Sequence, residues 1–117
     1  MSNDLTRRLK DAIRTVPNFP IEGVMFRDIT PVLGEPGLVS SITDQFVEDL
    51  NQLGWRPDVI VGPEARGFIF GPILADRLGC GFVPVRKPGK LPAPSRTVEY
   101  SLEYGSNSLE MHEDAIL

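Results

Sequence analysis

The chain has 117 residues, of which 41% are hydrophobic and 24% charged, and its formal net charge is −4. This length suits one domain, and the composition is that of a folded globular protein rather than a disordered one. The acidic balance argues against a general nucleic-acid binder, and no apolar run approaches the roughly 18 residues of a membrane-spanning helix. The single cysteine excludes an internal disulfide, and the N-terminus has no signal-peptide core, so a cytoplasmic location is expected.

The N-terminal half of the chain is predicted to hold two helices separated by an irregular segment. Apolar residues at helical spacing predict a helix over residues 4–16, capped by Asn3 or Asp4. Residues 17–37 contain four prolines and three glycines and show no periodicity. A connection of this length is usually disordered or a binding loop, and its apolar content favours an ordered loop. A second helix is predicted to start at Pro36 and to end at Gly54.

The middle of the chain has the pattern of a strand–helix–strand unit. A continuous apolar run after Asp58 predicts a strand buried on both faces. The apolar segment 67–78, closed by Gly79, predicts a helix, and residues 81–85 predict a second strand. Two strands joined in this way are expected to be parallel, with a right-handed crossover.

Positive charges follow both of these strands. The turn after the first strand contains two glycines and Arg66, so backbone N–H groups lie beside a cation. Arg86, Lys87 and Lys90 come directly after the second strand. Because parallel strands end at the same edge of a sheet, the two cationic segments are expected to converge on a polyanion such as a pyrophosphate. The alternative is an ordinary turn followed by a solvated loop.

The C-terminal part predicts a β-hairpin. Residues 93–98 are expected to be mobile, and residues 98–104 alternate between apolar and polar side chains as in a half-exposed strand. Residues 105–108 then predict a turn, and residues 109–112 alternate again. His112 is the only histidine and has no partner at metal-ligand spacing, so no metal-ligating residue is assigned.

Taken together, these segments resemble the adenine phosphoribosyltransferases of bacterial type, which belong to the type I phosphoribosyltransferase family. The resemblance covers about residues 13–116. It rests on four blocks in the family's order: Met25–Pro31, Glu64–Gly71, Val85–Pro92 and Tyr100–Gly105. It implies an α/β fold with a central, largely parallel sheet flanked by helices and a β-hairpin loop.

The resemblance also implies a reaction. Adenine would react with 5-phosphoribosyl-1-pyrophosphate (PRPP) to give AMP and pyrophosphate in purine salvage, with Mg²⁺ bound to PRPP and a homodimer as the working form. It implies that Phe26 stacks on the purine, while backbone groups around Met25 and Arg27 read the polar edge of the base. In the pyrophosphate-binding turn it implies a cis peptide between Glu64 and Ala65.

The remaining site residues follow from the same resemblance. Arg66 would place its positive charge beside the departing pyrophosphate and stabilise the negative charge that grows there. Arg86, Lys87 and Lys90 would assist, partly across a dimer interface. Tyr100 and Tyr104 would belong to a hairpin lid that closes over the site. On the same hairpin, Glu103 would exchange a proton with the imidazole part of the base as N9 attacks.

One part of the family pattern has no counterpart. The family continues with a hydrophobic strand, two adjacent acidic residues and a Gly/Thr-rich loop that binds the ribose 5-phosphate. Here the pair Glu113–Asp114 is followed only by residues 115–117. Residues 1–117 are therefore expected to form a single domain truncated before the PRPP-binding loop, with weak PRPP binding and little AMP formation. The alternatives are a PRPP- or purine-sensing regulator, a dimerising non-catalytic relative, and a xanthine or hypoxanthine phosphoribosyltransferase.

Overall fold

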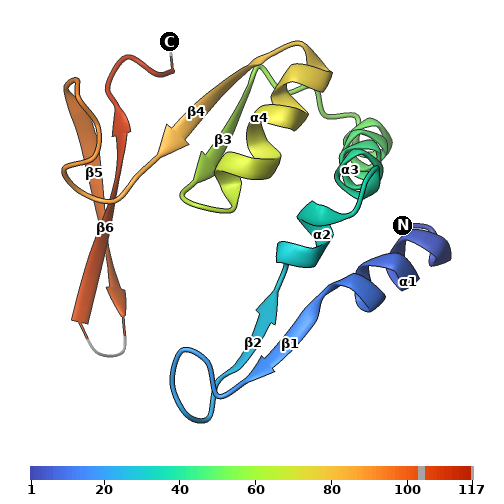
Figure 1. Cartoon of the computed structure of the whole chain (residues 1–117). Helices are drawn as coiled ribbons and strands as arrows, with labels where there is room; N and C mark the ends of the chain where they lie inside the picture. The colour runs from blue at the N-terminus through green and yellow to red at the C-terminus, as the bar shows by residue number, and fades with distance from the viewer. Residues whose placement is uncertain (103–104, 117) are drawn as a thin grey trace. The chain divides into compact units, whose positions relative to one another are not determined.

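The computed structural model describes residues 1–102 and 105–116. The chain forms two compact units, Met1–Gly54 and Trp55–Leu117. Figure 1 shows the elements in chain order. No helix in the part of the chain that the structure describes is both long and apolar enough to cross a membrane.

The N-terminal unit combines three helices with a β-hairpin. Its elements are α1 (Asn3–Ala12), β1 (Arg14–Pro17), β2 (Met25–Asp28), α2 (Thr30–Gly34) and α3 (Leu38–Leu53). The core forms where the helices meet: Leu5, Val32 and Leu38 are buried, one from each helix. Partly buried residues of α1 and α3 complete this cluster, among them Leu9 and Ile42. Burial of these side chains gives the unit its hydrophobic stabilisation.

The helix predicted over residues 4–16 is shorter than expected. It ends at Ala12, and β1 follows it, antiparallel to β2. Thr15 and Val16 are β-branched and pair with residues of β2, so their strand preference prevails over the helical spacing. The predicted caps are also wrong, because Ser2 caps the helix by accepting a hydrogen bond from the Leu5 N–H at 3.1 Å.

The irregular segment before α3 is ordered, as its apolar content predicted. It contributes β2 and the short helix α2. The following helix starts at Leu38, two residues after the predicted Pro36, and Gly37 takes a left-handed conformation immediately before it. The predicted end at Gly54 is confirmed, with φ of 71°.

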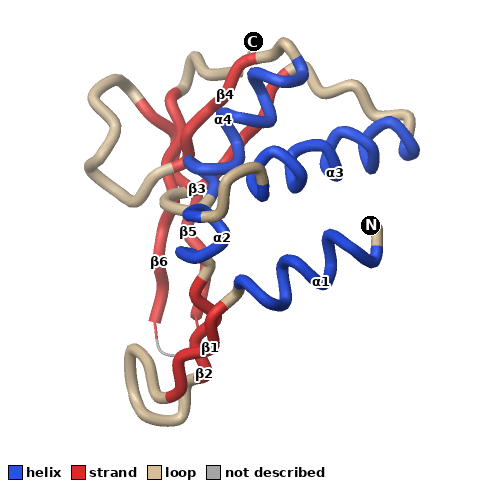
Figure 2. Tube along the Cα trace, turned by 45° about the vertical axis from the view of Figure 1, so that its right-hand side comes forward, coloured by secondary structure: helices blue, strands red, loops and turns tan. Residues whose placement is uncertain are grey.

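The C-terminal unit contains the predicted strand–helix–strand unit. β3 (Val59–Pro63) and β4 (Gly81–Val85) are parallel, in register from Val59 opposite Gly81 to Pro63 opposite Val85. The helix α4 (Gly67–Leu78) ends at Gly79, as predicted. It packs along both strands, which Figure 2 shows from a second direction. The expectation that the first strand is buried on both faces is wrong for the described residues, since β3 pairs only with β4 and Val61 is 45% exposed.

Glycines allow α4 to approach β3 and β4 very closely. A Cβ atom on Gly62 would lie 2.7 Å from the backbone oxygen of Gly67, and one on Gly71 would lie 2.3 Å from the ring of Phe82. Both distances are far shorter than a real Cβ atom tolerates. The turn between β3 and α4 is therefore fixed in shape by residues that have no side chain.

The hairpin is longer than the sequence predicted. β5 (Ser95–Leu102) and β6 (Gly105–His112) pair in antiparallel register, from Ser95 opposite His112 to Leu102 opposite Gly105. Residues 95–98, expected to be mobile, belong to β5, and residues 105–108, expected to form the turn, belong to β6. The first strand starts earlier than predicted because the hydroxyl groups of Ser95 and Thr97 donate hydrogen bonds to Glu110 on β6.

Candidate functional site

The predicted purine-binding segment forms one wall of a hollow in the N-terminal unit. The hollow has a volume of about 430 Å³. The rings of Phe19 and Phe26 meet there edge to face, with centroids 5.1 Å apart. Its other lining residues are Arg14, Val16, Asp28 and Thr30. An aromatic wall beside a few polar groups is the kind of site that holds a flat heterocycle.

The strand β2 separates the side chains of its residues onto two faces. Phe26 and Asp28 line the aromatic hollow, while Arg27 lines a different hollow together with Thr15, to which its guanidinium donates a hydrogen bond. Strand alternation places Met25 on the Arg27 face. Side chains at these two predicted positions are thus directed away from the aromatic hollow. Any contribution of Met25 and Arg27 to that hollow must come from their backbone, which agrees with the role expected for them.

Asp28 is the acidic group of the aromatic hollow. Its Oδ2 accepts from Arg14 Nη2 at 2.6 Å, and its Oδ1 accepts from both the N–H (2.9 Å) and the hydroxyl (2.6 Å) of Thr30. The hydrogen bonds from Thr30, followed by that from Arg14, lower the pKa of Asp28 to about 2. This carboxylate therefore stays ionised at neutral pH and fixes the hairpin against the start of α2. Asp28 was not singled out from the sequence, although an acidic residue close before a Thr-Pro helix start is a recognisable signal of a helix N-terminus.

The turn after β3, predicted to bind an anion, is joined to the end of β4. The peptide bond between Glu64 and Ala65 is cis, as the resemblance implied. Arg66 precedes the first turn of α4 and is exposed. The Glu64 N–H donates to the Val85 carbonyl at 3.0 Å, which joins this turn to the end of β4. Arg66 and the loop after β4 therefore leave the same edge of the sheet, as predicted.

The side chain of Glu64 binds the cationic loop, residues 86–90, which follows β4. Its Oε1 accepts from Arg86 Nε at 3.2 Å and from the Lys87 N–H at 2.9 Å. The Lys87 N–H, and next the Arg86 guanidinium, lower the pKa of Glu64. Arg86 also lies over the ring of Phe68, 5.7 Å from its centroid. Glu64 thus holds Arg86 and Lys87 in place, and its carboxylate is a poor direct partner for an anion.

The two lysines of the loop are exposed, and the hairpin lies beside them. Lys87 and Lys90 flank Gly89, whose N–H donates to the carboxylate of Glu110 on β6 at 2.7 Å. Glu110 was not predicted to belong to the site, because strand alternation alone marks it as an ordinary polar residue. Tyr100 lies on β5 and is 41% exposed. The predicted residues Glu103 and Tyr104 lie outside the described residues.

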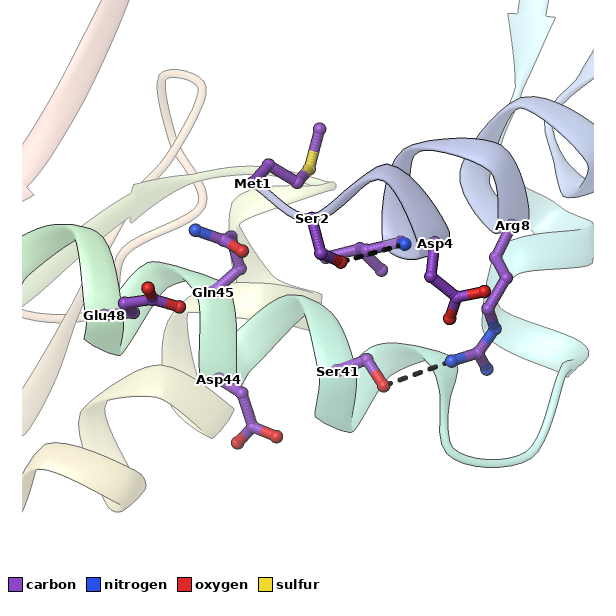
Figure 3. Close-up of a pocket in the computed structure, with 9 residues that line it drawn as sticks. Met1, Ser2, Asp4, Arg8, Ser41, Asp44, Gln45 and Glu48 are labelled. Atoms are coloured by element: carbon purple, nitrogen blue, oxygen red, sulfur yellow. Dashed lines mark hydrogen bonds between the residues drawn. The ribbon is translucent and has the colours of Figure 1, made fainter.

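A further hollow of about 490 Å³ lies between α1 and α3 and contains none of the predicted site residues. Figure 3 shows the carboxylates of Asp4, Asp44 and Glu48 around it, with Arg8 donating a hydrogen bond to Ser41. Three carboxylates beside one guanidinium suit a polyanion poorly. Among residues 1–102 and 105–116, no three His, Cys, Asp or Glu side chains gather into a group that could hold a metal ion.

Comparison with known proteins identifies the family. The model of the phosphoribosyl transferase domain matches residues 34–113. The chain belongs to this family. The resemblance to adenine phosphoribosyltransferases is also confirmed: the chain is 52% identical to the adenine phosphoribosyltransferase of Gloeothece citriformis over 108 residues, and 53% identical to that of Francisella tularensis over 107. Each alignment covers 92% of this chain.

Solved structures agree with the family assignment. The adenine phosphoribosyltransferase of Thermoanaerobacter pseudethanolicus matches 95% of this chain, with a TM-score of 0.87 and 51% identity. The enzyme of Saccharomyces cerevisiae, solved with adenine and an imino-altritol bisphosphate, matches 98%, with a TM-score of 0.91 and 44% identity. The predicted type I phosphoribosyltransferase fold is therefore confirmed. The chain spans 61–63% of the length of the two sequence relatives, and 63% and 66% of the two structures.

Proposed function

We propose that this chain carries the adenine-binding and pyrophosphate-binding parts of an adenine phosphoribosyltransferase, which converts adenine and PRPP into AMP and pyrophosphate. One observation carries the proposal: the turn with Arg66 and the loop with Arg86 and Lys87 are joined at one sheet edge through Glu64. Cations around backbone N–H groups at the carboxyl ends of parallel strands suit a diphosphate. The aromatic hollow at Phe26 supplies a second site, suited to a purine.

Recognition of adenine would use β2 in two ways. The Phe26 ring is 39% exposed, so a base can lie against it and bury more of its surface. In the described residues β2 pairs only with β1, so the alternate N–H and C=O groups of its other edge have no strand partner. Such an edge offers both a donor and an acceptor, which match the N1 acceptor and the 6-amino donor of adenine.

The reaction needs charge stabilisation on the leaving group. As the bond between the ribose and pyrophosphate breaks, negative charge grows on the pyrophosphate and an oxocarbenium-like ribose forms. Arg66, Arg86, Lys87 and Lys90 would bind that charge. Mg²⁺ bound to oxygens of PRPP would supply further charge neutralisation on the leaving group.

The proton step and the closing of the site are further parts of the proposal. Glu103 would take the N9 proton of adenine as N9 attacks the anomeric carbon, and the β5–β6 hairpin with Tyr100 and Tyr104 would exclude water. A homodimer, in which some cations act across the interface, and a cytoplasmic location belong to the same proposal. The resemblance of the chain to adenine phosphoribosyltransferases supports the homodimer and the location.

Product analysis with a panel of purines tests the proposal. The chain, at a concentration comparable to the substrates, is incubated with PRPP, Mg²⁺ and adenine, hypoxanthine, xanthine or guanine in separate reactions, and nucleotides are separated by chromatography. The proposal predicts AMP and pyrophosphate in equal amounts with adenine and far less product with the 6-oxopurines. The rate is expected to be low for residues 1–117, and preference for a 6-oxopurine would contradict the proposal.

A further inference from the structure

Glu110 of β6 contacts the cationic loop through both its backbone and its side chain. Its backbone forms a two-way bridge with Arg86, with N–H to O distances of 2.9 and 2.8 Å. Its Oε1 accepts from the Gly89 N–H at 2.7 Å. Its Oε2 accepts from the hydroxyls of Ser95 (3.0 Å) and Thr97 (2.9 Å). One residue thus contacts the beginning and the middle of the loop and the strand that follows it.

In the part of the chain that the structure describes, residues 87–90 of the loop are held by hydrogen bonds rather than by burial. Residues 87–90 are exposed, so hydrophobic burial does not hold them. Gly89 has φ of 79°, a conformation in which the chain turns sharply between Lys87 and Lys90. The two carboxylates that grip the backbone here are Glu64, at the Lys87 N–H, and Glu110, at the Gly89 N–H. Between them they hold the N–H of Lys87 and the N–H of Gly89, the residue before Lys90.

We propose that Glu110 is a positioning residue, which holds the Lys87–Lys90 loop in the shape that binds the diphosphate group of PRPP. The inference rests on the proposed function for the identity of the ligand. Both carboxylate oxygens of Glu110 already accept hydrogen bonds from protein donors, so Glu110 acts through the loop and does not contact the anion. Ordering the loop before binding removes an entropic cost that an unheld loop would meet on binding.

The electrostatics of the contact favour this role. The Gly89 N–H, followed by the hydroxyls of Thr97 and Ser95, lowers the pKa of Glu110, so the carboxylate is ionised and accepts all three hydrogen bonds at neutral pH. A negative charge close to a diphosphate would by itself weaken binding. Its presence beside the cationic loop is explained by hydrogen bonding to the loop backbone.

Nuclear magnetic resonance and calorimetry on the 117-residue chain can test the inference together. The variants are Glu110→Ala, which removes all three acceptor contacts, and Glu110→Gln, which keeps one acceptor oxygen for Gly89. Glu99→Gln, on an exposed residue of the same hairpin, is the matched control. The readouts are the amide shift and hydrogen exchange of Gly89, the affinity for Mg²⁺-pyrophosphate, and the affinity for adenine.

We expect the Gly89 amide of the native chain to be protected and to titrate with the Glu110 carboxylate. Glu110→Ala should abolish both properties and weaken pyrophosphate binding by roughly tenfold, as expected for loss of hydrogen bonds to a charged group. Adenine affinity should stay within about twofold, because none of the side-chain hydrogen bonds of Glu110 involves a residue that lines the aromatic hollow. Glu110→Gln should recover part of the loss, and Glu99→Gln should behave as the native chain.

Each contrary result has a separate meaning. An unchanged Gly89 amide, or unchanged pyrophosphate affinity in Glu110→Ala, overturns the positioning role while leaving the proposed function intact. Equal loss of adenine and pyrophosphate affinity also overturns it, since that pattern indicates general unfolding. If the native chain binds no pyrophosphate but Glu110→Ala still releases the Gly89 amide, the proposed function fails and the loop-holding role stands.

Discussion

Replacement of Gly62 by alanine should show how closely α4 must approach β3 for the anion-binding turn to form. The added Cβ would lie 2.7 Å from the Gly67 oxygen and 2.9 Å from the ring of Phe82. The first of these neighbours is backbone, which cannot move away as a flexible side chain can. The backbone of residues 63–66 must shift instead, which displaces the side chain of Arg66. The expected destabilisation is about 1–3 kcal/mol, the usual range for overpacking a filled site.

Thermal unfolding followed by circular dichroism measures this effect. A loss of about 1 kcal/mol should lower the midpoint by roughly 4 °C or more in a chain of this size. Gly81→Ala is the matched control, because a Cβ there meets nothing within 4 Å and its φ is not positive. That variant should stay within about 0.5 kcal/mol of the native chain. A Gly62→Ala chain as stable as Gly81→Ala, with unchanged pyrophosphate affinity, would refute the close-packing argument.

Three further substitutions test separate parts of the site. Phe26→Ala should weaken adenine binding by roughly tenfold or more, the magnitude of a lost base–aromatic stack, whereas Phe46→Ala on α3 should not. Arg66→Ala should weaken pyrophosphate binding by about tenfold, and the similarly exposed Arg56→Ala should leave it unchanged. An unchanged pyrophosphate affinity in Arg66→Ala would remove Arg66 from the site. Because the pKa of Asp28 falls from 3.8 to about 2 on folding, its stabilising effect is complete above about pH 4 and is lost as the pH falls through 2. The thermal midpoint of the native chain should therefore fall more steeply from about pH 4 to about pH 2 than that of Asp28→Asn, and equal slopes would contradict this assignment.

Much of the fold could be predicted from local patterns. The strand–helix–strand unit was predicted with correct bounds for α4, because an apolar run, a glycine stop and a second apolar run are all local signals. The N-terminal hairpin was missed because Ile13 and Val16 also fit helical spacing, and only pairing with residues 25–28 favours a strand. The length of the C-terminal hairpin was underestimated for the same reason, because its pairing joins residues as far apart in the chain as Ser95 and His112.

The site was predicted unevenly for a similar reason. Phe26, Arg66 and the cationic loop lie in compact sequence blocks. The location of Arg66 and of the cationic loop at the ends of two parallel strands could therefore be inferred. Asp28 and Glu110 act through hydrogen bonds to partners fixed by folding, and Glu110 meets Gly89 across 21 residues. No local pattern distinguishes such a glutamate from an exposed one. The predicted roles of Glu103 and Tyr104 stay predictions, as does the single domain over residues 1–117.

Two distinct sites on one chain, one for adenine and one for pyrophosphate, are the core of the proposed function. Amide chemical-shift mapping of the uniformly ¹⁵N-labelled chain is the decisive experiment, with adenine and Mg²⁺-pyrophosphate added in separate titrations. We predict that adenine shifts the amides of residues 25–28, and that pyrophosphate shifts those of residues 65–68 and of Lys87, Gly89 and Lys90. Saturable shifts confined to those two sets would support the two-site arrangement. Shifts in the α1–α3 hollow alone, the same shifts with both ligands, or none with either would contradict it.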